Sequence, residues 1–384
     1  MAAQAVSAAA LDAASLEAPP SLAHLRVALA HDWLVRYAGS ERVVEELLEL
    51  MPQARLFTTV RDANALPARL RRAEPSFIQG IPGATSHHEW LLPLMPLAWR
   101  LRRPLDDVDV VVSSSHACAN AVRVADGVPH VSYCHTPMRY AWDFASERER
   151  FPRPVRLPAA ALMRGFRRWD RNTSSRVTQF VANSAAVAER IRRFYGRDSL
   201  VVHPPVQTEF FTPGGSRDDF FLYVGRLVAY KNAELVVRTF AELPRDRLVV
   251  VGRGHLEARL RALATPNVEF LSSVDDHELR ELYRSSRALV YPADEDFGIV
   301  MAEAQACGTP VVALAAGGAL DIVVDRVTGV FVRDRTPLAL RAALSELKRL
   351  DLSSAVIAAS ASRFSAASFR AAFAEVVQSV VRGA

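Results

Sequence analysis

From residue 25 onward, short apolar runs alternate with amphipathic stretches. The apolar runs are continuous and rich in Val, which is typical of strands buried on both faces of a parallel sheet. The amphipathic stretches between them predict helices that cover those faces. We therefore predict strands over residues 25–30, 55–60, 76–79, 108–113, 130–133, 179–182, 220–224, 248–251, 268–271, 288–291, 311–313 and 330–332.

Helix ends are marked most clearly around residues 183–196. Asn183 and Ser184 form a good N-cap pair there, and Gly196 follows the last apolar position. The same periodic pattern recurs after most of the predicted strands. We predict helices over residues 43–50, 185–195, 232–243, 256–264, 276–285, 298–306, 338–350 and 366–381.

Two Pro/Gly clusters, at residues 203–205 and 212–215, interrupt the alternation near the middle of the chain. Such clusters are typical of a hinge between domains, and the alternation restarts after them. The pattern predicts an α/β fold in which two doubly wound, Rossmann-like domains face a central cleft. The expected parts are a disordered Ala-rich tail (1–24), a first domain (25–208), a second domain (209–365) and a C-terminal helix (366–384).

The composition indicates a globular protein. Of the 384 residues, 50% are apolar and 23% are charged, which excludes a globally disordered or fibrous chain. The longest apolar run, residues 311–320, is much shorter than the roughly 18–20 residues that span a bilayer. Three widely separated Cys residues argue against a disulfide framework or a zinc site, and for a reducing compartment.

Charge is distributed unevenly along the chain. Residues 1–200 carry 26 basic and 20 acidic side chains, whereas residues 201–384 carry 21 and 22. We therefore expect an anionic partner to lie against the first half. All basic residues except Lys231 and Lys348 are Arg, which gives weight to a Lys beside a predicted strand end.

Ligands of doubly wound sheets bind at the carboxyl ends of the strands. The loop after residues 288–291 is acidic and contains Glu295, and Gly298 then opens a helix that carries Glu303. The free N–H groups at the helix start suit a phosphate, and the two carboxylates can hold sugar or ribose hydroxyl groups. The alternative is that the acidic residues only stabilise the helix N-terminus.

A second candidate loop follows residues 220–224. Arg226 and Lys231 flank a turn that leads to Asn232, a possible N-cap. Two cations beside a helix N-terminus can neutralise a departing diphosphate. The alternative is a pair of surface cations. Arg253, between two glycines after the next strand, is a weaker candidate.

The first half offers a third group of candidates. Residues 31–33, with Gly39 at a helix start, suggest an anion cradle. His116 and His135 follow two further strands, where a neutral His can donate to a sugar hydroxyl, although a structural role is the alternative for both. A metal bound with Asp143, or by the Asp-x-Asp at residues 294–296, is disfavoured because these loops define no ligand spacing.

These residues resemble the retaining GT-B glycosyltransferases of family 4, over about residues 25–380. Arg226 with Lys231 looks like the diphosphate-binding pair of that family. Glu295 to Glu303, with Phe297-Gly298 between them, looks like its E-x7-E element. The loops at His116, at residues 135–140 and at residues 39–42 look most like those of bacterial mannosyltransferases that build O-antigen or exopolysaccharide.

The resemblance implies retaining transfer from a nucleotide-sugar, with GDP-mannose as the expected donor and no required metal or other cofactor. Arg226 and Lys231 would stabilise the departing diphosphate, Glu295 would hold the donor sugar, and Glu303 would bind the ribose. His116 would contact the donor sugar on its reacting face. The other expected donor-site residues are Gly39, Arg253, Phe297, Gly298 and Ile299.

The resemblance also implies that the first domain binds the acceptor and that the C-terminal helix packs back on it. The expected acceptor-side residues are His135, Arg139 and Asp143. Residues 148–176 carry nine Arg against two acids, and residues 90–103 mix Trp, Leu, Met and Arg. Such stretches can rest on an anionic membrane and meet a polyprenyl-pyrophosphate-linked saccharide, although a solvated helix is the alternative.

The expected location is therefore the cytoplasm, at the inner face of the plasma membrane. Two other functions stay open: a GT-B sugar-nucleotide epimerase, and a sugar-nucleotide-binding subunit without catalysis. A Rossmann dehydrogenase is disfavoured because no G-x-G-x-x-G opens the first helix. Nucleic-acid binding is disfavoured because the Arg excess lacks an accompanying series of aromatic residues.

Overall fold

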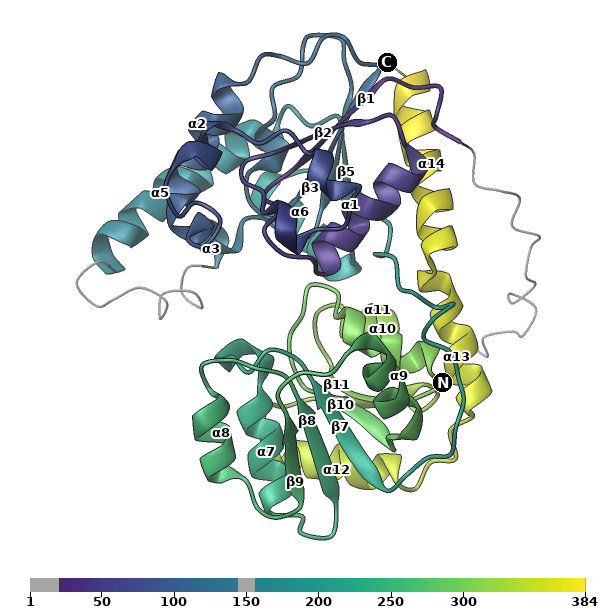
Figure 1. Ribbon diagram of the computed structural model, residues 1–384. Helices are drawn as coiled ribbons and strands as arrows, with labels where there is room; N and C mark the ends of the chain where they lie inside the picture. Colours follow the sequence, from purple (N-terminus) through teal and green to yellow (C-terminus); the bar gives the residue numbers. More distant parts are fainter. Residues whose placement is uncertain (1–20, 144–155, 384) are drawn as a thin grey trace.

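The computed structural model describes residues 21–143 and 156–383 and shows two lobes (Figure 1). Most of the predicted tail, residues 1–20, lies outside the described residues. Residues 21–24 are placed against the first lobe, where Leu22 is fully buried and its carbonyl accepts a hydrogen bond from the Gln53 amide (3.3 Å). The apolar core of the first lobe thus begins before residue 25.

The first lobe is built on a parallel sheet with strand order β2-β1-β3-β4-β5-β6. Its inner strands are buried along their length, because helices and loops cover both faces of their continuous apolar runs. The edge strand β6 was not predicted, since it is only three residues long and Leu200 and Val201 are 50% and 42% exposed. The strands are β1 (Val27–His31), β2 (Arg55–Thr58), β3 (Val110–Ser115), β4 (His130–Cys134), β5 (Gln179–Ala182) and β6 (Ser199–Val201).

One predicted strand of this lobe, residues 76–79, is wrong. The segment forms a short 3-10 helix, η4 (Phe77–Gly80), because the Ser76 hydroxyl accepts the N–H of Ile78 and caps a turn instead (3.2 Å). The other helices of the lobe are α1 (Gly39–Leu50), η5 (His88–Leu94), α2 (Met95–Leu101), η6 (Ala119–Ala121), α3 (Arg139–Trp142), α5 (Arg156–Ser174) and α6 (Ala185–Tyr195). Short 3-10 turns η2 (Ala63–Ala65) and η3 (Leu70–Arg72) complete it.

The second lobe repeats the design with strand order β12-β11-β10-β7-β8-β9, again all parallel. The predicted α/β fold of two doubly wound domains is confirmed. The strands are β7 (Phe220–Val224), β8 (Arg247–Val251), β9 (Val268–Leu271), β10 (Ala288–Tyr291), β11 (Val311–Leu314) and β12 (Gly329–Val332). The helices are η9 (Ala229–Lys231), α7 (Ala233–Ala241), α8 (Glu257–Leu263), α9 (Asp276–Ser285), α10 (Ile299–Ala306), α11 (Ala319–Ile322), α12 (Pro337–Leu347), α13 (Ser354–Ala361) and η10 (Ser362–Phe364).

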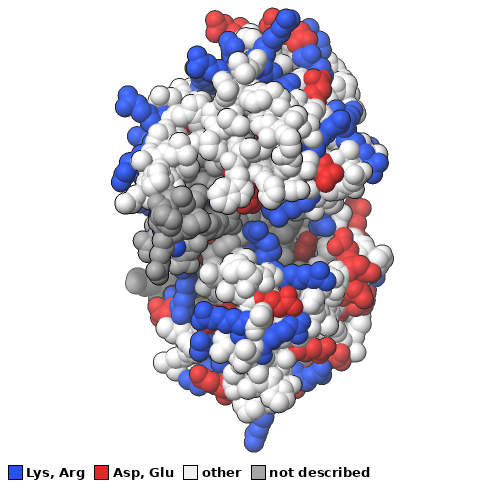
Figure 2. Space-filling model, turned by 60° about the vertical axis from the view of Figure 1, so that its left-hand side comes forward, with Lys and Arg blue, Asp and Glu red and all other residues white. Residues whose placement is uncertain are grey.

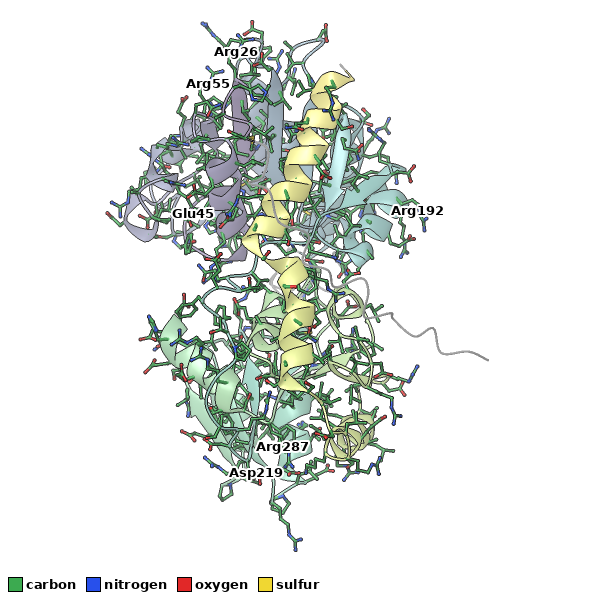
Figure 3. The ribbon with its side chains drawn as sticks, turned by 90° about the vertical axis from the view of Figure 1, so that its right-hand side faces the viewer. Arg26, Glu45, Arg55, Arg192, Asp219 and Arg287 are labelled. Carbon is green, nitrogen blue, oxygen red and sulfur yellow. The ribbon has the colours of Figure 1, made fainter. Side chains whose placement is uncertain are left out.

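The last helix, α14 (Ala366–Arg382), leaves the second lobe and runs along the first (Figures 1 and 3). Phe369 and Phe373 are buried there, with their ring centroids 5.7 and 6.1 Å from that of Tyr133 in β4. Arg370 forms an ion pair with Glu46 of α1. The helix therefore ties the two lobes together. Nowhere in residues 21–143 and 156–383 is there a helix with the length and apolarity needed to span a membrane.

Candidate active site

Lys231 and Glu295 meet where the carboxyl ends of two neighbouring strands, β7 and β10, come together. The Lys231 ammonium lies 2.5 Å from the Glu295 carboxylate. The Tyr291 hydroxyl joins them: it accepts a hydrogen bond from Lys231 (2.8 Å) and donates one to Glu295 (3.1 Å). About 85% of each charged side chain is covered (15% and 13% exposed), so the pair is held in a partly dry environment. The ammonium and one carboxylate singled out in the sequence thus lie in contact.

Several cationic side chains contact Tyr230, which lies beside this pair. Its hydroxyl accepts a hydrogen bond from the Arg226 guanidinium (2.5 Å). The Lys231 ammonium lies 5.4 Å from the centroid of its ring, and Arg139 of the first lobe approaches the same ring at 5.1 Å. Three cations from both lobes therefore surround one aromatic ring. The sequence did not single out Tyr230, although its place between Arg226 and Lys231 was a usable signal.

The turn that carries Arg226 is held by close backbone packing. A Cβ at Gly252 would lie 2.0 Å from the carbonyl oxygen of Gly225, and one at Gly254 would lie 2.2 Å from that of Leu227. Only glycine allows this approach. Arg253, between them, is exposed and donates to the carbonyl of Ser272 (3.1 Å). This hydrogen bond connects the loop after β8 to the loop after β9.

Glu303 lies on α10 among different partners. Its carboxylate accepts a hydrogen bond from Tyr283 (3.2 Å) and pairs with Arg42 of the first lobe (3.3 Å). Burial raises the pKa of Glu303 to about 7, and Arg42 opposes that rise. Arg42 also lies 3.5 Å from Asp276. The two carboxylates of the E-x7-E element therefore face different surroundings, as their predicted roles require.

The loop between β10 and α10 is held in place by the segment that follows β11. Gly318 donates its N–H to the carbonyl of Glu295 (2.8 Å), and a Cβ at Gly317 would lie 2.3 Å from that same oxygen. The close approach of these two glycines is thus to the Glu295 loop. Gly298, at φ 92°, starts α10, and a Cβ there would lie 2.3 Å from the end of the Met301 side chain.

Two predicted donor-site residues follow in this loop. The ring of Phe297 is 4% exposed and packs between His203 and Phe364, with centroid distances of 5.5 and 5.4 Å. Its side chain therefore supports the hinge and is not turned toward Lys231 and Glu295. Ile299 begins α10 and is partly buried against the second core.

Asp32 organises the wall of the first lobe. It ends β1 and is fully buried, and its carboxylate accepts four successive backbone N–H groups, from His116, Ala117, Cys118 and Ala119, at 2.5–2.9 Å. The Nδ1 atom of His116 lies 3.3 Å from the same carboxylate. This arrangement fixes the backbone of His116, while the Nδ1 atom of its ring lies near the carboxylate without forming a hydrogen bond within the described residues.

Three imidazole rings cluster behind this wall. His31, His116 and His135 have centroids 5.6–6.4 Å apart. Burial lowers the pKa of His116, while Asp32 raises it in part, and burial lowers the pKa of His135 well below its usual value. Both rings are therefore neutral near pH 7, as a hydrogen-bonding role toward a sugar needs. His135 shares a hydrogen bond with the Ser114 hydroxyl (2.8 Å).

The start of α1 lies next to these rings. Glu41 accepts the N–H of Ala38 and the hydroxyl of Ser40, both at 3.0 Å, and lies 3.7 Å from Nε2 of His31. Burial raises the pKa of Glu41, but the neighbouring His31 outweighs it, so the net pKa is lowered. A Cβ at Gly39 would meet nothing within 4 Å, so open space adjoins this helix start.

Ion pairs and hydrogen bonds connect the two lobes. Asp296 pairs with Arg190 of α6 and lies 3.8 Å from Arg139, while the Ser184 hydroxyl donates to its carbonyl (2.5 Å). The Asp321 carboxylate accepts the N–H of Ala185 (2.9 Å). The Asp-x-Asp acids thus face guanidinium groups, and no cluster of three metal-binding side chains occurs in the described parts of the chain. Basic side chains gather at the waist between the lobes in Figure 2.

Arg139 and Asp143 lie just before the gap in the described residues, which resume at residue 156. Arg139 reaches across to the second lobe, as its contacts with Tyr230 and Asp296 show. Asp143 is exposed at the C-terminal end of α3, where its N–H bonds the carbonyl of Arg139 (2.8 Å). Of the three predicted acceptor-side residues, Arg139 and His135 lie beside the other candidates, and Asp143 lies at the margin.

Comparisons with known proteins identify the families that the two halves of the chain resemble. Residues 37–210 match the family model "Glycosyltransferase Family 4", and residues 207–363 match "Glycosyl transferases group 1". The sequence resemblance to the family is confirmed at this level. The two matches meet between the Pro/Gly clusters that we interpreted as a hinge.

Curated relatives include D-inositol 3-phosphate glycosyltransferases. The one from Geodermatophilus obscurus is 39% identical over 212 residues, which are 46% of this chain and 47% of that protein. The one from Xylanimonas cellulosilytica is 34% identical over 212 residues, 47% of this chain and 51% of that protein. The chain spans about half the length of the curated relatives it matches.

Solved structures share the whole fold at low identity. Anabaena HepE, in complex with UDP and glucose, has a TM-score of 0.68 at 17% identity and covers 93% of this chain and 100% of its own. Sucrose-phosphate synthase from Thermosynechococcus elongatus has a TM-score of 0.69 at 18% identity and covers 94% and 100%. At this identity the likeness shows the GT-B fold.

Proposed function

Because the chain has the GT-B fold and its two halves match two glycosyltransferase family models, we propose that it is a retaining glycosyltransferase that uses a nucleotide-sugar. One observation carries the proposal. Lys231, Glu295 and Arg226 converge around Tyr230 and Tyr291 at the carboxyl ends of β7 and β10. This is the edge at which doubly wound sheets bind nucleotides.

In the proposed mechanism, the donor diphosphate enters beside the Lys231–Glu295 pair. Lys231 and Arg226 bind its phosphate oxygens and offset the charge that develops as the glycosidic bond breaks. Glu295 is then free to accept hydrogen bonds from the donor-sugar hydroxyls and to stabilise positive charge at the anomeric carbon. This division of work requires no metal, although a bound cation would add to the same charge compensation.

Glu303 and Gly39 complete the donor site in this proposal. Glu303 binds the ribose hydroxyls, and its contact with Arg42 couples ribose binding to the first lobe. Gly39 leaves room for the diphosphate to approach the start of α1. A neutral His116, held by Asp32, donates to the donor sugar on its reacting face. The acceptor attacks from the leaving-group side, where a phosphate oxygen takes its proton, so no protein base is assigned.

The donor we propose is GDP-mannose, on the likeness of the His116, His135 and Gly39 loops to bacterial mannosyltransferases. The acceptor we propose is a saccharide or a polyprenyl-pyrophosphate-linked saccharide in cell-surface polysaccharide synthesis, reached from the cytoplasmic face of the membrane. The relatives named D-inositol 3-phosphate glycosyltransferase favour a second acceptor class, a soluble phosphorylated polyol. HepE binds UDP and glucose, which makes UDP-glucose the competing donor to test.

A thermal-shift screen with GDP-, UDP-, ADP- and dTDP-sugars tests the donor. The donor that stabilises the protein most is then incubated with acceptors, and products are analysed for released nucleotide and anomeric configuration. A transferase yields a new α-linked product from an α-linked donor. Isomerised donor without acceptor consumption would instead indicate an epimerase, and donor binding without turnover would indicate a non-catalytic subunit.

A further inference from the structure

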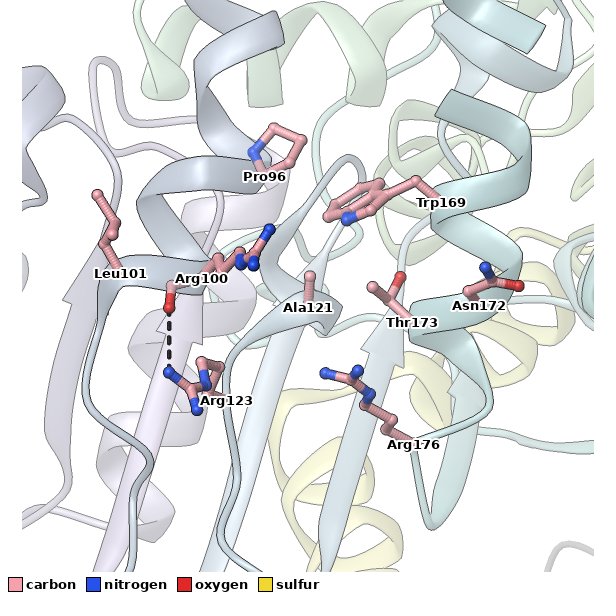
Figure 4. A pocket seen from close by; sticks show the side chains of 9 residues that line it. All are labelled: Pro96, Arg100, Leu101, Ala121, Arg123, Trp169, Asn172, Thr173 and Arg176. Atoms are coloured by element: carbon pink, nitrogen blue, oxygen red, sulfur yellow. Dashed lines mark hydrogen bonds between the residues drawn. The ribbon is translucent and has the colours of Figure 1, made fainter. Parts of the chain in front are cut away.

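A pocket of about 680 Å³ opens on the flank of the first lobe, outside the site between the lobes (Figure 4). Its walls come from three segments: α2, the turn at and after η6, and the C-terminal half of α5. No residue assigned to the donor site lines it. The lining residues are Pro96, Arg100, Leu101, Ala121, Arg123, Trp169, Asn172, Thr173 and Arg176.

The charge of the pocket is entirely positive. Its lining holds three guanidinium groups and no carboxylate. Arg123 donates to the carbonyl of Arg100 (3.3 Å), and within the described residues none of the three arginines forms an ion pair. Many other arginines of the chain are paired, for example Arg190 with Asp296 and Arg370 with Glu46. Unpaired guanidinium groups that share one pocket are suited to a phosphate group.

Exposed apolar side chains lie on the two helices that contribute to the pocket: Leu101 is in its wall, and the leucines of α5 lie in the other, N-terminal half of that helix. Leu97 and Leu101, one turn apart on α2, are 44% and 65% exposed, and Leu157 and Leu162 on α5 are 83% and 45% exposed. Trp90, on η5 just before α2, is 67% exposed. In Figure 2, uncharged side chains cover a broad area of the upper lobe, with basic side chains at its borders. Water is a poor environment for so many leucines on two adjacent helices.

The geometry points to an anionic phospholipid bilayer as the partner of this face. The phosphate of a glycerophospholipid enters the pocket and binds Arg100, Arg123 and Arg176. The exposed leucines of α2 and α5 enter the boundary between headgroups and acyl chains, as in a helix that lies in the membrane interface. A soluble phosphate or an acidic saccharide would account for the arginines but not for the leucines.

This inference deepens the proposed function, because it names the surface through which the enzyme would meet a membrane-bound acceptor. Binding itself needs no catalysis, so the two claims can fail separately. The pocket lies on the flank of the lobe, so a bilayer at this face leaves the gap between the lobes uncovered. An acceptor anchored in the same bilayer could reach that gap from the side.

Vesicle flotation tests the inference with the full chain. The wild type is mixed at low salt with phosphatidylcholine vesicles that contain or lack phosphatidylglycerol. We expect flotation only with phosphatidylglycerol, and release at high salt. Failure to float with anionic vesicles at low salt would overturn the proposal. So would thermal stabilisation of the protein by inorganic phosphate or by an acidic oligosaccharide, if the vesicles give no such stabilisation.

Matched variants locate the contact. Arg123→Gln/Arg176→Gln removes two charges from the pocket, and Arg245→Gln/Arg247→Gln removes two exposed charges from the second lobe. We expect the pocket variant to partition about 30-fold less, at about fivefold per basic side chain, and the control to partition like the wild type. Equal losses in both would show unspecific attraction and reject the pocket.

A third variant, Leu97→Ser/Leu101→Ser, tests the apolar part and should weaken flotation with anionic vesicles at low salt, although it removes no charge. Retention of wild-type partition would reject the insertion of α2. Nucleotide thermal shifts, measured on every variant, report the donor site separately. If transfer activity is absent while pocket-dependent flotation persists, the proposed function fails and the lipid contact stands.

Discussion

The Asp32 carboxylate accepts the backbone N–H of His116 at 2.6 Å and lies 3.3 Å from the Nδ1 atom of the same residue. One buried acid thus holds the backbone of the candidate donor-facing histidine and lies beside its ring. The next three N–H groups of the loop bind the same carboxylate. Two loops that follow different strands are therefore joined at the candidate site of the first lobe.

Asp32→Asn tests this anchoring. An amide has one acceptor oxygen, so its NH₂ group would face backbone N–H groups and leave about two of them without a partner. Each such loss costs roughly 1–3 kcal/mol, so we expect the Tm to fall by about 5–10 °C. Thermal unfolding measures it. The control is Asp109→Asn, at an exposed pair with Arg26, and a similar loss there would remove the special role of Asp32.

Lys231→Ala and Glu295→Ala should each lower turnover by at least about 100-fold, the scale of one lost transition-state charge contact. The double variant should lose less than the product of the two effects, because the side chains act as one unit. Transfer kinetics measure both points. Lys348→Ala, which breaks a pair with Asp246 on the far side of the second lobe, is the control and should keep wild-type turnover. Near-normal turnover of the site variants would reject the site.

Glu303 makes stability depend on pH. Since burial raises its pKa to about 7, the folded protein holds a proton that the unfolded chain releases near its ordinary pKa. This contribution is fully present below the ordinary pKa and is lost as the pH rises to about 7. Its size is on the order of 3 kcal/mol.

Glu303→Gln removes this titration. We therefore expect the Tm of the variant, relative to the wild type, to increase between pH 5 and pH 8. Thermal unfolding over that range measures the difference, and Glu375→Gln on α14 is the control. Parallel pH profiles of wild type and Glu303→Gln would contradict the raised pKa. In the donor-binding assay, affinity should rise with pH through about 7 in the wild type and lose that dependence in Glu303→Gln.

Two glycine variants distinguish a glycine that leaves room for a ligand from one that allows close backbone packing. Gly39→Ala places a methyl group in open space, so we expect an unchanged Tm and weaker donor binding. Gly318→Ala places it 2.2 Å from the carbonyl oxygen of Phe297, so we expect both a lower Tm and a loss of turnover through a displaced Glu295 loop. Unfolding and donor titration distinguish them. Normal donor affinity in Gly39→Ala would exclude the diphosphate from the start of α1.

The sequence by itself determined the two-lobed α/β fold and singled out Lys231 and Glu295 as residues of one site, whereas their direct ion pair came only from the structure. Strands buried on both faces leave continuous apolar runs, and residues that follow neighbouring parallel strands must meet at one edge of the sheet. The strand β6 and the turn η4 were missed, because β6 is a short, exposed edge strand that pairs with β5 and η4 is formed by a local side-chain cap rather than by burial.

Tertiary structure alone decided the contacts between the lobes. Arg42 lies 261 positions before Glu303, and no local pattern links them. In the same way, Gly317 and Gly318 pack closely against the Glu295 loop, and the Phe297 ring packs against His203 of the hinge. The pocket beside α5 also needs three distant segments to converge. The alternation of buried and exposed residues can be seen in the local sequence. Contacts between the lobes depend instead on how whole sheets and helices pack against one another.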